Sequence, residues 1–154
     1  MASPEQRLEE LGIQLPDPAR PLAAYVPTVR TGNLVYVSGQ VPVVDGKPIH
    51  IGRLGGGGLG VEQGVEAAER CAVNVLAALK AELGELSRIR RIVKLTGFVA
   101  SAPDFNDQPK VVNGASELFV KVFGDAGKHA RSAVGMAALP LGVPVEVEAI
   151  VEVE

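Results

Sequence analysis

Hydrophobic side chains recur at helical spacing in two stretches of the chain. The first stretch runs from Val65 to Leu83 and is followed by Gly84; the second runs from Asp107 to Gly124. An apolar residue at every third or fourth position lines one face of an α-helix, so each stretch predicts an amphipathic helix that ends at a glycine. The apolar positions are Val65, Ala68, Ala72, Val75, Leu76, Leu79 and Leu83 in the first helix and Val112, Ala115, Phe119 and Val122 in the second.

A shorter helix is predicted near the N-terminus. Ser3 is followed by Pro4 and, three positions on, by Gln6, which is the pattern of a helix start closed by a capping box. Gly12 ends this helix. Residues 14–24 contain three prolines, which interrupt helices, and we expect this segment to form an extended arm.

The remaining apolar segments predict β-strands. The last of them, residues 145–153, alternates between valine or alanine on one face and mainly glutamate on the other, which is typical of a half-buried strand. If residues 131–138 form a symmetric hairpin with this strand, Arg131 lies opposite Val151 and away from Glu146. The predicted strands are residues 25–29, 34–37, 41–44, 89–99, about 131–138, and 145–153.

These elements make one domain over residues 1–154, with the order β-β-β-α-β-α-β-β after the N-terminal helix and arm of residues 1–24. The length of 154 residues suits a single domain. Two amphipathic helices can cover only one face of such a sheet. The other face is therefore either solvated or buried against partner chains.

Composition excludes several functional classes. Lysine plus arginine number 15 against 18 acidic residues, and the net charge of −3 gives no broad basic surface, so we expect no nucleic-acid partner. Cys71 is the one cysteine and the chain has 2 histidines, which argues against a disulfide within the chain and against a metal site. The apolar stretch of residues 71–79 is far too short to span a bilayer, and there is no signal-peptide pattern. We therefore expect a cytoplasmic protein without membrane contact.

Residues 55–60 contain the glycine spacing of a dinucleotide-binding fingerprint, and a helix follows them. That fingerprint also needs an acidic residue about 20 positions on, at the end of the next strand. Here the corresponding positions, 80 to 82, fall inside the predicted helix. We therefore interpret the segment as a flexible glycine-rich loop.

Most of the other polar side chains that stand out have ordinary structural explanations. We expect His50 and His129 in turns or at the surface, with no serine paired to either, and Cys71 packed in the core. The expected helix-capping residues are Asp104, Asp107 and Asp125, and the basic residues at a solvated strand start are Arg88, Arg90, Arg91 and Lys94.

Arg131 and Glu146 each allow two interpretations. Arg131 begins a strand of small and apolar residues, where it is either simply exposed or a guanidinium fork that binds a carboxylate through two hydrogen bonds. Glu146 lies on the alternating strand, where it is either a solvent-facing residue or an acid–base group.

A set of short motifs extends across most of the chain, from about Tyr25 to Val153. They are Ser38-Gly39-Gln40-Val41-Pro42, Val93-Lys94-Leu95-Thr96-Gly97-Phe98-Val99, Ala130-Arg131-Ser132-Ala133-Val134, Leu139-Pro140 and Val145-Glu146-Val147-Glu148-Ala149. Together they resemble the motifs of the RidA/YjgF family of reactive-intermediate deaminases. The resemblance implies an α+β, chorismate-mutase-like fold in which a mixed β-sheet carries two helices on one face. It also implies a homotrimer with clefts between subunits.

The same resemblance implies roles for individual residues. Arg131 matches the arginine that binds the substrate carboxylate, and Glu146 matches the glutamate that orients or activates water. Tyr25, Gly39 and Asn113 match positions that line the family's cleft. The implied reaction is hydrolytic deamination of enamines and imines, such as 2-aminoacrylate and 2-iminopropanoate, to a 2-keto acid and ammonia. It uses no metal or organic cofactor, so the expected partners are a small carboxylate-bearing imine, enamine or keto acid and further copies of the chain.

The chain differs from well-known members of this family at a few places. Ala133, also at the substrate-binding cleft, stands where those members have a cysteine, residues 45–66 are longer and richer in glycine, and about four extra residues precede Asn113. These differences favour, as the alternative, a non-catalytic trimeric protein that binds or senses small carboxylate metabolites. Ribonuclease activity, which is sometimes attached to the family's names, fits poorly with a net charge of −3.

Overall fold

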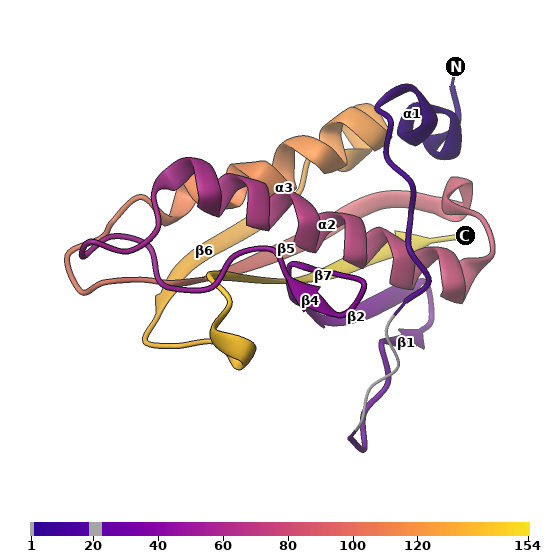
Figure 1. Ribbon diagram of the computed structural model, residues 1–154. Helices are drawn as coiled ribbons and strands as arrows, with labels where there is room; N and C mark the ends of the chain where they lie inside the picture. The colour runs from indigo at the N-terminus through magenta and orange to yellow at the C-terminus, as the bar shows by residue number, and fades with distance from the viewer. Residues whose placement is uncertain (1, 19–22) are drawn as a thin grey trace.

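A mixed five-stranded sheet with two long helices on one face forms the body of the protein (Figure 1). The computed structural model describes residues 2–18 and 23–154, so residues 19–22 of the predicted arm lie outside the described residues. Neighbouring strands are antiparallel, except for one parallel pair. In sheet order the strands are β1 (Thr28–Thr31), β2 (Leu34–Gln40), β7 (Val145–Val153), β5 (Ile89–Ala100) and β6 (Ala130–Met136), and β5 and β6 are the parallel pair.

The two predicted long helices are confirmed as α2 (Val61–Leu83) and α3 (Gln108–Phe123), which pack against each other above the sheet (Figure 1). The residues that follow them, Gly84 and Gly124, have φ angles of 81° and 63°. Glycine adopts these left-handed angles without strain, which is why both helices end there. Within the described ranges, no helix is long and apolar enough to cross a membrane.

The short N-terminal helix α1 (Pro4–Glu10) has the predicted capping box, in which Ser3 and Gln6 satisfy each other's backbone N–H groups. Glu5 anchors this helix to the domain. Its Oε2 lies 2.9 Å from Nζ of Lys80 on α2 and accepts a hydrogen bond from the Leu86 N–H at 2.8 Å. Burial raises the pKa of Glu5, but the hydrogen bonds from Lys80 and Leu86 outweigh it, so the pKa is lowered overall.

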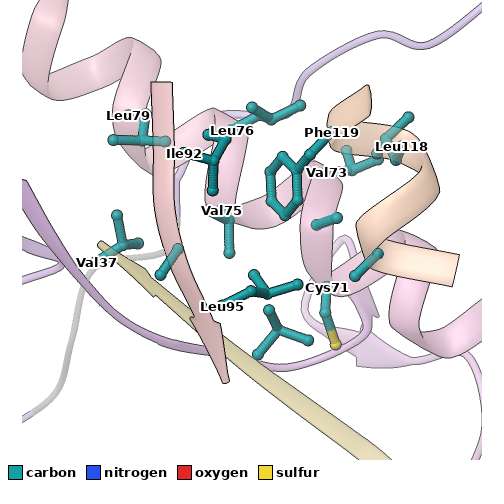
Figure 2. Packing of buried hydrophobic residues seen from close by; sticks show 14 of the residues in the cluster. Val37, Cys71, Val73, Val75, Leu76, Leu79, Ile92, Leu95, Leu118 and Phe119 are labelled. Carbon is teal, nitrogen blue, oxygen red and sulfur yellow. The ribbon is translucent and has the colours of Figure 1, made fainter. Parts of the chain in front are cut away.

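The core lies between the sheet and the two long helices (Figure 2). Leu76 of α2, Phe119 of α3 and Leu95 of β5 are each 0% exposed and lie close together there. Burying one such side chain stabilises the fold by about 1.5–3 kcal/mol. The central strand β7 contributes every second side chain to this core, as its alternating pattern predicts, namely Val145, Val147, Ala149, Val151 and Val153.

The hairpin considered for the last two strands does not form. β6 pairs with β5, not with β7, and it does so in parallel, with Arg131 opposite Leu95. The reason is that α3 forms the crossover of a β-α-β unit, which returns the chain beside β5 in the same direction. β7 then takes the place between β2 and β5, where its apolar face is covered by the helices.

Two of the other predicted strands differ from the structure. The first strand begins at Thr28, not at residue 25. Residues 41–44 do not join the main sheet; only β3 (Val43–Val44) is a strand, and it pairs with β4 (Lys47–Pro48) in a separate two-stranded sheet. A 3₁₀ turn precedes β5, a second follows α3 and a third precedes β7, and these are η1 (Leu86–Arg88), η2 (Gly124–Gly127) and η3 (Pro140–Gly142).

The glycine-rich segment of residues 55–60 is a loop of turns and bends, as predicted, and the residue before it is anchored to the core. Leu54 is 0% exposed, its N–H donates to the carbonyl of Ala100 at 2.8 Å, and its own carbonyl accepts from the N–H of Ala102 at 2.8 Å. Leu54 therefore packs at the edge of the core and holds the start of the loop beside the end of β5. Gln63 closes the start of α2 by accepting a hydrogen bond from the Gly60 N–H at 3.0 Å.

The sheet face opposite the helices is uncovered within the described part of the chain. The outward positions of β7 carry Glu146, Glu148, Ile150 and Glu152, as the alternation predicts. Apolar side chains also lie on this outer face. Among them, the side chain of Val29 is 54% exposed, that of Tyr36 46% and that of Val134 38%. Their strand partners, and their alternation with buried neighbours, show that these three side chains point outward.

The crossing of α2 and α3 depends on a glycine. A Cβ at Gly114 of α3 would collide with the carbonyl oxygen of Val65, which is backbone and cannot move aside. A Cβ at Gly64 of α2 would instead approach only methyl groups, at 3.0 Å on Val111 and 3.1 Å on Leu54. We expect Gly114→Ala to lower the free energy of unfolding by about 1–3 kcal/mol, despite the higher helix propensity of alanine.

Gly64→Ala is the matched control, because side-chain methyl groups can shift and alanine favours the helix. We expect it to change the free energy of unfolding much less than Gly114→Ala. Urea denaturation at a fixed protein concentration measures both values. Equal effects of the two substitutions would contradict the view that this backbone contact sets the distance between the helices.

Candidate functional site

Arg131 lies at the free edge of the sheet, on the side of the helices. It is paired with Leu95, a fully buried residue, and side chains of directly paired residues point to the same face. The half-buried Arg131 side chain therefore reaches α3. Its Nη1 donates hydrogen bonds to Oδ1 of Asn113 at 2.8 Å and to Oγ of Ser116 at 3.2 Å.

Nη1 carries two hydrogens, and these two bonds use both of them. Nε and Nη2 make no hydrogen bond within the described part of the chain, and no carboxylate there forms an ion pair with Arg131. This leaves the Nε–Nη2 edge of the guanidinium, which offers two parallel N–H donors. Two parallel donors at this spacing match the two oxygens of a carboxylate.

A serine–histidine pair extends this network away from Arg131. Ser116 Oγ lies 2.9 Å from Nε2 of His129, and Nδ1 of the same ring lies 2.6 Å from the carbonyl oxygen of Gly127. A carbonyl can only accept, so we assign the ring proton to Nδ1, which makes Nε2 the acceptor and Ser116 the donor. The prediction that no serine pairs with a histidine is therefore wrong.

His129 is half-buried, and its ring packs edge-on against Phe119 with centroids 6.2 Å apart. Burial lowers the pKa of His129; the Gly127 carbonyl opposes this shift and the nearby charge of Arg131 adds to it. The net lowering favours the neutral ring that the hydrogen bonds require. Sequence periodicity gives no signal for this pair, because the two residues belong to α3 and to the turn before β6.

Glu146 lies on the opposite, outer face of the sheet. It alternates along β7 with the buried Val145 and Val147, and it is paired with Phe98 of β5. Its carboxylate lies directly over Gly39 of β2, where any Cβ would collide with it. Burial, and then the neighbouring charge of Glu148, raise the pKa of Glu146 above the usual value.

Tyr25 and Ala133 complete the set of predicted site residues. Tyr25 is 58% exposed and precedes Val26, whose carbonyl accepts a hydrogen bond from Ser38 of β2 at 2.6 Å, so Tyr25 lies near the end of β2. Ala133 is two residues beyond Arg131 on β6 and packs against the core on the helix side.

The predicted site is therefore divided into two groups within one chain. Arg131 and Asn113 meet directly at the β6 edge, and Ala133 follows on the same strand. Gly39 and Glu146 meet on the outer face. β5 separates β6 from β7, and among the described residues no hydrogen bond or ion pair joins Arg131 to Glu146.

The remaining candidate residues serve the fold. Cys71 is fully buried, with its thiol 3.5 Å from the Val145 carbonyl, and burial followed by the charge of Glu146 raises its pKa. His50 is less exposed than expected, at 19%, and its Nε2 lies 3.5 Å from Oε2 of Glu66. Asp107 occupies the N-cap position of α3, but its side chain makes no capping hydrogen bond. In the described ranges, no three His, Cys, Asp or Glu side chains gather as metal ligands do.

The sequence and the fold of this chain are similar to those of known proteins. A family model described as "YjgF/chorismate_mutase-like, putative endoribonuclease" matches residues 5–152. The Trypanosoma cruzi protein TCP17 is 48% identical over 146 residues, which make up 94% of this chain and 91% of that protein. A 2-iminobutanoate/2-iminopropanoate deaminase of Dermatophagoides farinae is 31% identical over 142 residues, or 92% of this chain and 95% of that enzyme.

A solved structure agrees along nearly the whole chain. The crystal structure of Atu1372, a protein of unknown function from Agrobacterium tumefaciens, matches with a TM-score of 0.92 and 52% sequence identity. The match covers 98% of this chain and 92% of that one. These likenesses confirm the predicted α+β, chorismate-mutase-like fold with its mixed sheet.

The pKa of Glu146 tests the electrostatics of the outer-face group. Because the charge of Glu148 contributes to the raised pKa, we expect Glu148→Gln to lower the pKa of Glu146 towards its usual value. NMR titration of the side-chain carboxyl carbon measures this pKa. Glu69→Gln, which removes an exposed charge on α2, is the control and is expected to leave the pKa unchanged. An unchanged pKa in Glu148→Gln would show that burial alone causes the shift.

Proposed function

The chain belongs to the YjgF (RidA) family, and on that basis we propose that it hydrolyses small carboxylate-bearing enamines and imines to a 2-keto acid and ammonia. The substrates of this class include 2-aminoacrylate and 2-iminopropanoate. The observation that carries the proposal is the free Nε–Nη2 edge of Arg131, a half-buried cation without an ion-pair partner among the described residues. The similarity to a named 2-iminobutanoate/2-iminopropanoate deaminase supports the same substrate class.

Arg131 binds the substrate carboxylate and thereby orients the imine. Two parallel N–H···O bonds fix both the position and the plane of a carboxylate, which a single charge does not. The imine carbon is attached directly to that carboxylate, so its position is fixed too. A fixed carbon beside an oriented water converts a collision between two molecules into a local step.

Glu146 supplies acid–base assistance. Water adds to the imine carbon while the Glu146 carboxylate takes one of its protons and passes it to the imine nitrogen, which gives a neutral tetrahedral carbinolamine. Glu146 then takes the hydroxyl proton of the carbinolamine and passes it to the amino nitrogen, so that the C=O bond forms as the C–N bond breaks and ammonia and the 2-keto acid are released. A raised pKa brings a carboxyl group closer to the pH at which it can both accept and return a proton.

We further propose that the chain forms a homotrimer and that adjacent subunits complete each site. Within one chain Arg131 lies at the β6 edge and Glu146 on the outer face, so one subunit does not bring them together. If the β6 edge of one subunit lies against the outer face of the next, the two groups meet in a cleft. The exposed apolar side chains Val29, Tyr36 and Val134 support burial of this face.

A non-catalytic carboxylate-binding or regulatory protein is the second candidate. The observation that favours it is Ala133, which packs against the core and offers no reactive group near Arg131. Such a protein would keep the Arg131 fork but would not turn over an imine. Ammonia release therefore distinguishes the two functions, whereas carboxylate binding alone does not.

Deamination is tested with 2-iminopropanoate generated in situ. We expect Arg131→Ala to slow ammonia and 2-oxopropanoate release by roughly 30- to 1000-fold, because losing a bidentate carboxylate contact costs about 2–4 kcal/mol. Arg90→Ala is the matched control, since Arg90 is exposed on β5, and it should retain the native rate. A background rate in the native protein, together with 2-oxopropanoate binding that needs Arg131, would favour the binding protein instead.

The assembly is tested by mass in solution. We expect a species of three times the 16.0 kDa chain mass by light scattering. Tyr36→Asp places a charge on the apolar outer face, and it should shift the protein towards monomer and reduce activity at the same time. A native protein that stays monomeric at assay concentration would overturn the shared-site proposal.

A further inference from the structure

We propose that Ser116 and His129 are positioning residues that hold the Arg131 guanidinium in the orientation that accepts a carboxylate. This inference rests on the proposed function of Arg131 and adds two residues to its site. The resemblance assigns no role to either residue. A continuous line of contacts runs from the core through His129 and Ser116 to the Arg131 guanidinium.

His129 is the fixed end of this line. Its ring packs edge-on against Phe119, which is 0% exposed, and Nδ1 donates to the Gly127 carbonyl at 2.6 Å. Gly127 itself lies so close to α3 that a Cβ there would collide with the Phe119 carbonyl oxygen. The imidazole is therefore held by both the core and the turn that precedes β6.

Ser116 connects the fixed His129 ring to Arg131 through two hydrogen bonds of its hydroxyl group. A neutral His129 with its proton on Nδ1 can only accept at Nε2, so the Ser116 hydroxyl hydrogen points to the ring. The oxygen lone pairs then point away from the ring, and one of them receives the Arg131 Nη1–H at 3.2 Å. A serine without this histidine is free to rotate its hydroxyl, and the hydrogen can then take the place of the lone pair.

Asn113 provides the second contact to the same nitrogen. Asn113 and Ser116 are three residues apart on α3, so they project from one face of the helix, and both accept from Nη1. Two contacts to one terminal nitrogen fix the plane of the guanidinium and direct its Nε–Nη2 edge outward. An arginine already fixed in this way loses less freedom when a ligand binds.

The inference is tested with the Ser116→Ala variant, by measuring both its binding of 2-oxopropanoate and its deamination kinetics. We expect the dissociation constant and KM to rise about 3- to 10-fold with little change in kcat, because the contact orients the carboxylate and does not touch the reacting carbon. Ser116→Thr keeps a hydroxyl and should restore most of the affinity. His129→Ala should weaken binding as Ser116→Ala does, and His129→Gln, which keeps an acceptor, should weaken it less.

Ser101→Ala is the matched control, because Ser101 accepts a hydrogen bond from Gln108 at the start of α3 but does not contact Arg131. It should leave binding unchanged. The Arg131→Ala background decides whether Ser116 acts through the arginine: there, adding Ser116→Ala should cause no further loss. A full additional loss in that background, or an equal loss in Ser101→Ala, would overturn the positioning role.

A ligand-free measurement separates this inference from the proposed function. ¹⁵N relaxation of the Arg131 side chain should show a more mobile guanidinium in Ser116→Ala and in His129→Ala than in the native protein or Ser101→Ala. The His129 ring nitrogens should show the proton on Nδ1. An equally rigid Arg131 in all variants, or a proton on Nε2, would overturn the inference even if the protein proves to be a deaminase. A protein that binds no 2-oxopropanoate and yet shows the expected mobility would overturn the proposed function alone.

Discussion

The register of β7 between β2 and β5 is the constraint on which the rest of the structure depends. Its alternation places Val145, Val147 and Val151 under the helices and Glu146 and Glu148 on the outer face. A slip of one residue would reverse both sets, burying carboxylates under α2 and exposing the valines. The pattern therefore tolerates one register only. That register also fixes where Glu146 stands, over Gly39 of β2, so core packing and the placement of a candidate acid–base group have a single cause.

The β-α-β crossover through α3 places Arg131 on the other side of the sheet from Glu146. It brings β6 to the sheet edge beside β5, in parallel, and turns Arg131 towards the helix and away from Glu146. The chain thus carries one part of the site at an edge and the other on an open face. Both places are surfaces that a single chain leaves uncovered. The proposed trimer would bury them together, which links the apolar outer face to the chemistry and not only to assembly.

Around Arg131 the protein uses neutral hydrogen-bond acceptors where an ion pair would be the simpler choice. An aspartate or glutamate in place of Asn113 would neutralise the guanidinium and compete with any anionic ligand. An amide oxygen and a hydroxyl instead hold Nη1 and leave the charge unbalanced. The neutral His129 fits the same logic, since burial and the arginine charge both lower its pKa. The Arg131 guanidinium is therefore held in place while its positive charge is not neutralised.

Much of this protein can be predicted from the sequence, because helix and strand periodicity depend on neighbours only a few residues apart. The long helices, their glycine ends, the capping box at Ser3 and the two faces of residues 145–153 all follow from such local patterns. The family motifs single out Arg131 and Glu146 only as candidate site residues. The pairing of β6 could not be predicted, because a hairpin and a crossover have the same local sequence pattern. The anchoring of Leu54 and the contact of Ser116 with His129 were not predicted either. Only the tertiary structure decided these features, since each depends on which distant segments the packed core brings into contact.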